Sequence, residues 1–543
     1  MEQAIQQTNI RKGLTGLVIP IFIETLLIMM LGAVDTVMLS QYSDESVAAV
    51  GVVNQIVMFA FLVFEVINIG TSVLCSQYLG AGLRQKMVQV VGVSLCLNLA
   101  VGLLVSAILH FGAETLLGWM GLRPELLKYG VGYMQIVGAF AFFQALSLTV
   151  SASLRSANKA IYPMLVTVLV NVMNIIGNYT LIFGKFGLPA LGAEGAAIST
   201  SIARGVSMVV LFVILFRKHI PSFPVRYFRP FPWKELKNLL KVGLPSAGEN
   251  MSYSFSQVVI TYLINMLGNN ALATRTYTVN IVMFVYLFAI AMAQGGAITI
   301  GHLVGQRKVR AAYLLGKYVM RLSILVSLIL SCIWAALGHT IFSLLTDNPE
   351  IIRMGVTVMI VDVVVEIGRA VNIYATNALR SAGDVNYPFY VGLVVQWTVS
   401  VGFSYLFGIH WGWGLVGMWC AFLLDENIRA FIFVKRWGSM KWARKLSAEP
   451  YLYTGLECPD NGSTESGHLQ FVYSLDRNTS RSRHFFNFQC RMCLFVGKQQ
   501  LGGSFQSLSQ HLHGILRLDT HFHSSLHGCL YIFQYISNAA GSQ

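Results

Sequence analysis

The chain has 543 residues, of which 55% are hydrophobic and only 11% are charged, and its formal net charge is +14. Because a soluble domain carries about 25% charged residues, this chain lacks the polar side chains that a water-soluble protein of its length needs on its surface. The basic residues lie mostly in short segments between apolar runs, so membrane topology explains the net charge better than nucleic-acid binding does, and we expect no nucleic-acid partner.

Twelve apolar runs are long enough to cross a bilayer as helices, for which about 20 residues are needed. Their approximate bounds are 14–39, 48–75, 88–111, 128–151, 161–183, 193–216, 242–267, 276–300, 315–338, 351–375, 387–408 and 413–435. The sequence therefore predicts an all-α integral membrane protein with twelve transmembrane helices.

The basic residues of the loops predict how the chain is oriented. Alternate loops carry them in pairs or clusters, as at Arg84 and Arg155, whereas the loops between hold few, among them Arg123 and Arg275. Since cytoplasmic loops are enriched in Lys and Arg, we expect a multi-pass protein of the cell membrane, inner or plasma, with both termini in the cytoplasm.

Composition also predicts the division of the chain. A basic, proline-containing segment, 217–241, is expected to be a cytoplasmic linker between an N-terminal six-helix lobe, 1–216, and a C-terminal six-helix lobe, 242–440. Residues 441–543 form a predicted cytoplasmic tail without a spanning run. Its Cys-x-x-Cys pair, which begins at Cys490, matches no standard zinc module. We assign the tail no role and expect it to be disordered or read outside its natural frame.

The strongest signal is an internal repeat. LRSANKAIYP begins at Leu154 and LRSAGDVNYP begins at Leu379, an offset of 379 − 154 = 225 residues. The same offset pairs Pro20 with Pro245, Glu24 with Glu249, and Gly80 with Gly305. Each half holds six predicted spans, an even number, so both halves begin on the same side of the membrane. Two parallel, pseudo-symmetric six-helix lobes with a substrate cavity between them follow from this arrangement.

Ionisable side chains inside a bilayer are costly and are therefore functional candidates. The first predicted span contains Pro20, Glu24 and Asp35, and the two acids lie about three helical turns apart on one face. Pro20 also frees a backbone carbonyl that a cation could use. The seventh span repeats Pro245 and Glu249 but has an apolar residue where Asp35 falls, so the halves are chemically unequal.

Two further groups of polar residues lie in predicted spans. The tenth span carries Asp362, Glu366 and Arg369 on one face, where Arg369 can neutralise one of the acids. The fifth span carries Asn174 and Asn178 one turn apart, and the sixth carries Thr200. A buried carboxylate can take up a proton, and a carboxylate with amide and hydroxyl oxygens can hold Na⁺. Both coupling ions stay open, as do purely structural roles in ion pairing and polar helix contacts.

Near the end of the last span, Asp425, Glu426 and Arg429 are expected to have an interfacial role.

Several motifs, in order along both halves, resemble one transporter family. They are GAVDTVMLS from Gly32, QYLGAG from Gln77, LRSANKAIYP, GAEGAAIST from Gly192, VGLPSAGE from Val242 and EIGRAVNIYATNALRSAGD from Glu366. Over about residues 10–440 the chain resembles the multidrug and toxic compound extrusion (MATE) transporters. The resemblance implies a V-shaped pair of lobes and export of organic, often cationic, compounds in exchange for H⁺ or Na⁺.

The resemblance also implies roles for single residues. Asp35 matches the family's acid in the first span, which is tied to cation coupling, and Asn174 and Asn178 fall where the fifth span completes that site. With Na⁺ as coupling ion, these three residues would be its ligands; some members have an Asp in place of Asn178, so a Na⁺ site here would hold one fewer charge. The remaining candidates for coupling or substrate binding are Glu24, Thr200, Glu249, Asp362 and Glu366. Structural roles are assigned to Pro20, Pro245, Arg155, Arg380 and Arg369.

Other function classes fit the sequence less well. A lipid-linked oligosaccharide flippase of related architecture would need basic residues facing the cavity to hold a pyrophosphate, whereas the predicted charges within the spans are mainly acidic. The sequence contains no HExxH, nucleophile or phosphate-loop motif, so we expect no enzyme. We expect a monomeric secondary transporter whose partners are a small organic substrate, a coupling cation and the lipid bilayer, with no cofactor beyond that ion.

Overall fold

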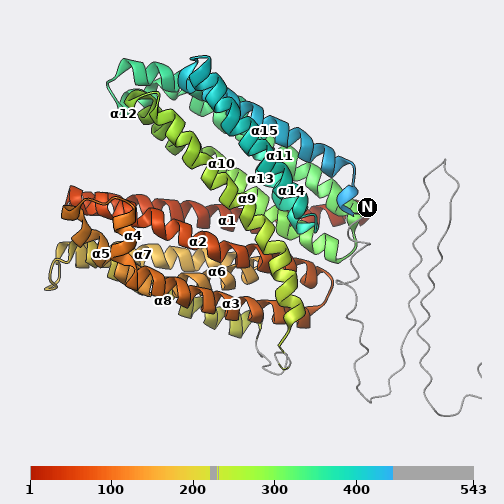
Figure 1. The fold of residues 1–543 in the computed structure, drawn as a ribbon. Coiled ribbons are helices and arrows are strands. Elements are labelled where there is room, and N and C mark those ends of the chain that lie inside the picture. Colours follow the sequence, from red (N-terminus) through yellow and green to blue (C-terminus); the bar gives the residue numbers. More distant parts are fainter. Residues whose placement is uncertain (1, 221–228, 230, 444–543) are drawn as a thin grey trace, which may run out of the picture. The chain divides into compact units, whose positions relative to one another are not determined.

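The structure is a computed structural model that describes residues 2–220, 229 and 231–443. Throughout this part of the chain the fold is helical, without a strand, and a helix lies at each of the twelve predicted runs (Figure 1). The prediction of an all-α membrane protein is thereby confirmed. The predicted tail beyond residue 443 lies outside the described residues, as do most residues of the predicted linker between 221 and 230.

The first half of the chain forms eight α-helices and one π-helical turn. These are α1 (Glu2–Ser40), α2 (Asp44–Gly80), α3 (Arg84–Phe111), α4 (Ala113–Trp119), α5 (Pro124–Ala139), α6 (Ala141–Ser156), α7 (Ile161–Phe183), α8 (Gly192–Ile214) and η1 (Leu215–His219).

The second half repeats this order. It comprises α9 (Trp233–Asn265), α10 (Asn269–Gly305), α11 (Val309–Ala336), α12 (Gly338–Leu345), α13 (Pro349–Ser381), α14 (Asn386–Val395), the π-helical segments η3 (Gln396–Val401) and η4 (Ser404–His410), and α15 (Gly414–Gly438). Four helices of the first half, α2 to α5, begin 225 residues before α10 to α13, as 269 − 44 = 225 illustrates. The repeat seen in the sequence is therefore a repeat of structure.

Length and apolarity alone identify fewer spans than the sequence motifs do. Eight helices in the described part of the chain are long and apolar enough to cross a membrane, and the pair α5 and α6, bent by 45°, makes a ninth. The three predicted spans that fall short are α9, α13 and α15, with 33, 33 and 25 residues. These helices carry buried acids of the second half, among them Glu249, Asp362 and Glu426, so their low apolarity marks the polar interior of that lobe.

Three details differ from the prediction. The fourth predicted span is broken at Phe140, between α5 and α6. The short helices α4 and α12 follow the third and ninth spans and were not predicted. The predicted linker is also shorter than 217–241, because α9 already begins at Trp233. In its first turn, Glu235 accepts a hydrogen bond from the Tyr78 hydroxyl at 2.7 Å, which ties this end of α9 to the N-terminal lobe.

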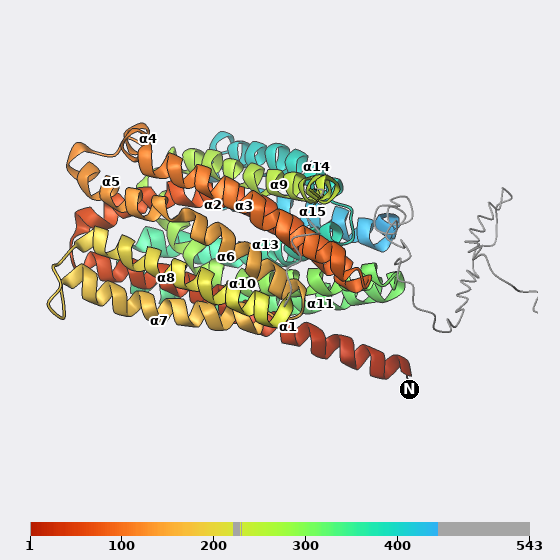
Figure 2. The same ribbon diagram turned by 90° about the horizontal axis from the view of Figure 1, so that it is seen from below.

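The first helix of each half packs against both lobes. Leu17 and Ile21 of α1 are buried in the same apolar cluster as residues of α10, α11, α13 and α15, while the helix as a whole also contacts α7 (Figure 2). In the same way, Leu239 of α9 lies in a cluster of the N-terminal lobe and Ile260 in one of the C-terminal lobe. Figure 1 shows α9 passing from one lobe to the other. A movement of either helix therefore affects both lobes.

The two lobes meet where α2 and α10 end. A Cβ atom on Gly80 would lie 2.2 Å from the carbonyl oxygen of His302, and one on Gly305 would lie 2.1 Å from that of Gln77. These positions are related by the repeat, since 305 − 80 and 302 − 77 both equal 225. Only glycine permits this mutual approach of the two backbones.

Two hydrogen bonds join the lobes beside these glycines. Gln77 Nε2 donates to the carbonyl oxygen of Ser381 at 2.8 Å, and His302 Nε2 lies 2.6 Å from the carbonyl oxygen of Ser156. The offset of 225 relates Gln77 to His302 and Ser156 to Ser381. The lobes are thus connected by two copies of one contact, with different side chains.

Candidate functional site

A chain of buried amides and hydroxyls in the N-terminal lobe includes Asp35. Asn178 Nδ2 donates to Asp35 Oδ1 at 2.6 Å and to Asn174 Oδ1 at 2.9 Å. Asn174 Nδ2 in turn donates to Thr200 Oγ1 at 3.0 Å. The structure therefore brings four of the predicted site residues together from α1, α7 and α8.

A basic residue stands next to this site. Arg204 of α8 lies near enough to Asp35 for their charges to interact, and its guanidinium is 5.2 Å from the centre of the Phe61 ring. Its Nη1 atom is buried and makes no hydrogen bond within the described residues. Arg204 was not among the predicted site residues, although an arginine inside the sixth apolar run is as unusual as an acid there.

Hydrogen bonds engage most of the oxygen atoms around Asp35. Amide N–H groups donate to Asp35 Oδ1, Asn174 Oδ1 and Thr200 Oγ1. Asn178 Oδ1 is buried and accepts no hydrogen bond within the described residues. A Na⁺ ion held by Asp35, Asn174 and Asn178 would therefore share oxygen atoms with amide donors, whereas a proton needs only one carboxylate oxygen without a donor.

The repeated acids form repeated ion pairs. Arg155 Nη1 lies 2.9 Å from Glu24 Oε1, and Arg380 Nη2 lies 2.8 Å from Glu249 Oε2. Arg155 and Arg380, for which only a structural role was predicted, thus neutralise two of the predicted coupling acids. Although Glu24 shares a helix face with Asp35, its hydrogen-bonding partner lies in α6 and not in the Asp35 chain.

Glu65 of α2 has no counterpart in the repeat, where an isoleucine stands at residue 290. It lies near both Arg155 and Arg380, close enough for their charges to act on it. Besides its paired carboxylate, each of these two guanidiniums thus also acts on Glu65.

The C-terminal lobe holds a denser network. Glu366 and Arg369 of α13 form an ion pair, and Arg369 is also 3.8 Å from Glu426 of α15. Arg429 lies 2.5 Å from Asp425 and 3.2 Å from Glu426. The expectation of an interfacial role for Asp425, Glu426 and Arg429 is wrong, because all three are buried against α13.

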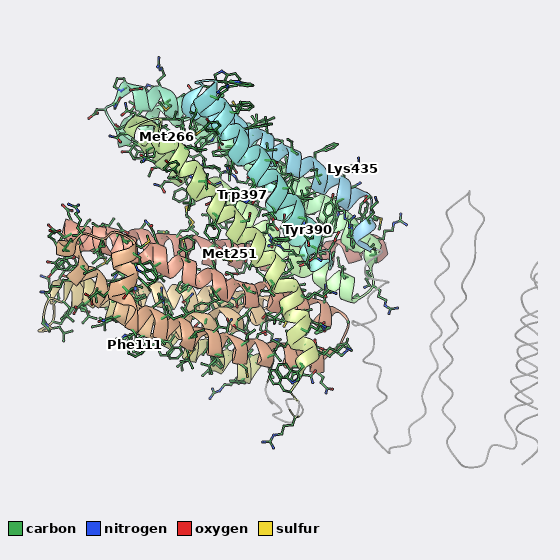
Figure 3. The ribbon with its side chains drawn as sticks, in the orientation of Figure 1. Phe111, Met251, Met266, Tyr390, Trp397 and Lys435 are labelled. Atoms are coloured by element: carbon green, nitrogen blue, oxygen red, sulfur yellow. The ribbon has the colours of Figure 1, made fainter. Side chains whose placement is uncertain are left out.

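A cavity of about 540 Å³ opens onto this network. Its lining comes from α9, α10, α13, η3 and α15, so this cavity lies within the C-terminal lobe. Gln396 and Ser400 reach the cavity from the π-helical segment η3, a type of irregularity that often marks functional sites. Beside them, Trp397, labelled in Figure 3, donates to Ser252 of α9 at 3.1 Å and holds η3 in place.

Comparison with known proteins agrees with this architecture. The MatE family model matches residues 20–180 and 245–406, two ranges that begin 245 − 20 = 225 residues apart. An uncharacterized transporter of Bacillus subtilis, YisQ, is 38% identical over 452 residues, which cover 82% of this chain and 99% of that protein. The probable multidrug resistance protein NorM of Thermotoga maritima is 25% identical over 80% of this chain and 94% of its own length.

Solved structures share the fold. A transporter of the MOP superfamily from Pyrococcus furiosus superposes with a TM-score of 0.74 at 22% identity, over 81% of this chain and 97% of that structure. An outward-facing MATE transporter of the same superfamily has the same TM-score, identity and coverage. The family match, the curated relatives and the twofold six-helix fold together lead to one conclusion: the chain belongs to the MatE family of multi-pass membrane transporters and is not an enzyme.

Proposed function

We propose that this transporter exports organic compounds that carry a positive charge, by antiport with H⁺, and that Asp35 is the coupling group. The observation that carries the proposal is the 2.6 Å hydrogen bond from Asn178 to Asp35, which joins α1 and α7 at the head of a buried amide chain. A proton on the free oxygen of Asp35 neutralises this carboxylate without displacing any of these donors.

The position of α1 gives the proton a mechanical effect. Protonation weakens the charge-assisted hydrogen bond from Asn178 and removes the attraction between Asp35 and Arg204. The other end of α1, around Leu17, lies in the apolar core of the C-terminal lobe. A change in the contacts of Asp35 therefore moves α1 and alters the contact between the lobes. In alternating access the two lobes rotate relative to each other at this contact.

Exchange of substrate and proton follows from competition for negative charge. The acids of the two lobes attract an organic cation while they are ionised, and proton uptake removes part of this attraction. The proposal keeps both termini in the cytoplasm, as the basic loops predict, and takes one chain as the functional unit.

Efflux from proteoliposomes tests the proposal. The purified full-length chain is reconstituted with the cationic dye rhodamine 123, and dye movement is followed under an imposed pH gradient or an imposed Na⁺ gradient. We expect export under the pH gradient alone, its loss in Asp35→Asn, and no effect of Asp44→Asn, a control at an exposed acid in the first turn of α2. Export driven by Na⁺ alone would refute coupling to H⁺.

A lipid-linked oligosaccharide flippase is the second candidate. It would need several free basic groups to hold a pyrophosphate, yet carboxylates engage three of the four arginines that line the cavity, Arg369, Arg380 and Arg429, and leave only Arg275. Absence of dye movement under either gradient, with folded protein, would favour this candidate over the antiporter.

A further inference from the structure

The charged side chains of the C-terminal-lobe cavity are paired with two exceptions. Three of its arginines form the ion pairs described above, which engage Glu249, Glu366, Asp425 and Glu426. Among the lining residues this leaves one guanidinium, Arg275, and one carboxylate, Asp362, without an ion-pair partner within 4.0 Å in the described part of the chain.

Arg275 projects from the second turn of α10 toward α9. It donates from Nη1 to the Thr261 hydroxyl and from Nη2 to Gln257 Oε1 at 3.2 Å, and both acceptors are neutral. A guanidinium has five N–H groups, so three remain for another acceptor. Arg275 was expected among the few basic residues of the outer loops, whereas the structure places it in the cavity wall.

Asp362 lies on α13 and is only 3% exposed. Its Oδ1 atom accepts a hydrogen bond from the indole Nε1 of Trp419 at 2.9 Å, and Oδ2 has no hydrogen bond among the described residues. Arg369 is the basic group whose charge acts on it most, but that guanidinium is already held by Glu366 and Glu426. A buried carboxylate with a free oxygen has strong affinity for a positive group that can enter the cavity.

Aromatic side chains lie among the charged groups. Tyr253, Tyr286, Trp419 and Phe422 line the cavity, and the ring of Tyr286 has the Arg369 guanidinium 5.9 Å from its centre. Flat faces of this kind bind aromatic or apolar frameworks. The volume of about 540 Å³ falls in the ordinary range for a drug-sized ligand.

We propose that this cavity is a binding site for zwitterionic aromatic compounds, with the cationic group of the ligand at Asp362 and its anionic group at Arg275. This deepens the proposed function, on which it rests for the statement that bound compounds are exported. A ligand with a positive group alone would leave the Arg275 guanidinium partly desolvated without a counter-charge, which is costly. A ligand with a negative group alone would leave the Asp362 carboxylate buried without a counter-charge.

A matched pair of dyes tests the inference. Rhodamine 110 is a zwitterion at neutral pH, and its methyl ester, rhodamine 123, is a cation on the same ring system. Binding of each dye to the purified full-length protein in detergent is measured by fluorescence polarisation, without any ion gradient. Wild type is expected to bind the free acid more tightly than the ester, and Arg275→Gln should weaken binding of the free acid about tenfold while leaving the ester unchanged.

Two further variants make the test specific. Asp362→Asn should weaken binding of both dyes, since both carry the positive group. Arg353→Gln removes an exposed arginine of α13 outside the cavity and should change neither. If Arg275→Gln fails to fold, as judged by its thermal unfolding midpoint, Arg275→Lys keeps the positive charge and should still prefer the free acid.

The outcomes separate this inference from the proposed function. Equal losses for both dyes in Arg275→Gln, or no loss for either, would overturn the anionic subsite even if export remains driven by a pH gradient. A selective loss for the free acid would support the subsite even if neither gradient drives export, in which case the antiport proposal alone fails.

Discussion

Glu24 and Arg155 form an ion pair at 2.9 Å in the N-terminal lobe, and the residues 225 positions further on, Glu249 and Arg380, form the same pair at 2.8 Å in the C-terminal lobe. In each lobe the pair joins the first helix to the arginine of the motif LRSA, and a proline precedes the acid by one turn. The repeat thus preserves a specific tertiary contact together with the residues that make it.

Removal of the arginine from either pair should destabilise the protein, because it leaves a buried carboxylate without its counter-charge, a loss of about 3 kcal/mol or more. The Arg380 side chain is 5% exposed and that of Arg155 is 19% exposed. We therefore expect Arg380→Met to lower the thermal unfolding midpoint in detergent more than Arg155→Met does. The double variant Glu249→Gln with Arg380→Met should recover part of the loss, and failure to do so would show that the pair is not the cause.

The sequence was sufficient to predict the helices and their pseudo-symmetry because both depend on local features. Runs of about 20 apolar residues and a fixed offset of 225 need no knowledge of tertiary contacts. Helices α4 and α12, with 7 and 8 residues, are too short to leave such a pattern. The break at Phe140 also has no proline to mark it, so it becomes visible only in the packed structure.

The candidate site was predictable in part. Asp35, Asn174, Asn178 and Thr200 were singled out by residue type and spacing, and they do hydrogen-bond in one chain. The sequence could not show that Glu24 is neutralised by Arg155, since the two lie 131 positions apart and on different helices. It also could not show which face of α15 is covered by α13, so the buried position of Asp425 and Arg429 was missed.

The close approach of α2 and α10 should be sensitive to a single methyl group. Gly80→Ala places a Cβ atom against the backbone of His302, so we expect this end of the lobes to separate and dye efflux to fall severalfold. Gly51→Ala, on the same helix with nothing within 4 Å of the added atom, is the matched control. Spin labels at the exposed residues Gln85 and Arg310, with the native cysteines replaced, would report the distance by pulsed electron resonance. An unchanged distance in Gly80→Ala would contradict this account.

The two hydrogen bonds between the lobes predict a specific rescue. His302 and Gln77 occupy equivalent positions and both contact a serine carbonyl. His302→Gln should therefore retain dye efflux, because it puts the side chain type of Gln77 at the equivalent position of the C-terminal lobe. His302→Leu, which cannot form this hydrogen bond, should lose most of the efflux. Equal activity of the Gln and Leu variants in proteoliposomes would show that the hydrogen bond to Ser156 has no part in transport.

Arg204 should help to exclude Na⁺ from the Asp35 site. Its positive charge acts on Asp35, and a like charge within a few ångströms opposes a metal cation by about 1 kcal/mol or more, depending on the local dielectric. In Arg204→Gln this repulsion is lost and the charge of Asp35 is no longer compensated, so we expect a Na⁺ gradient to begin to drive efflux of rhodamine 123.

The control is Arg217→Gln, at an exposed residue of η1, the segment that directly follows α8. Efflux by this variant should remain insensitive to a Na⁺ gradient. Efflux is measured in proteoliposomes at equal pH on both sides, so that Na⁺ is the only driving ion. If Arg204→Gln stays as insensitive as wild type, the arrangement of amide donors at Asp35, and not the charge of Arg204, is what excludes the metal.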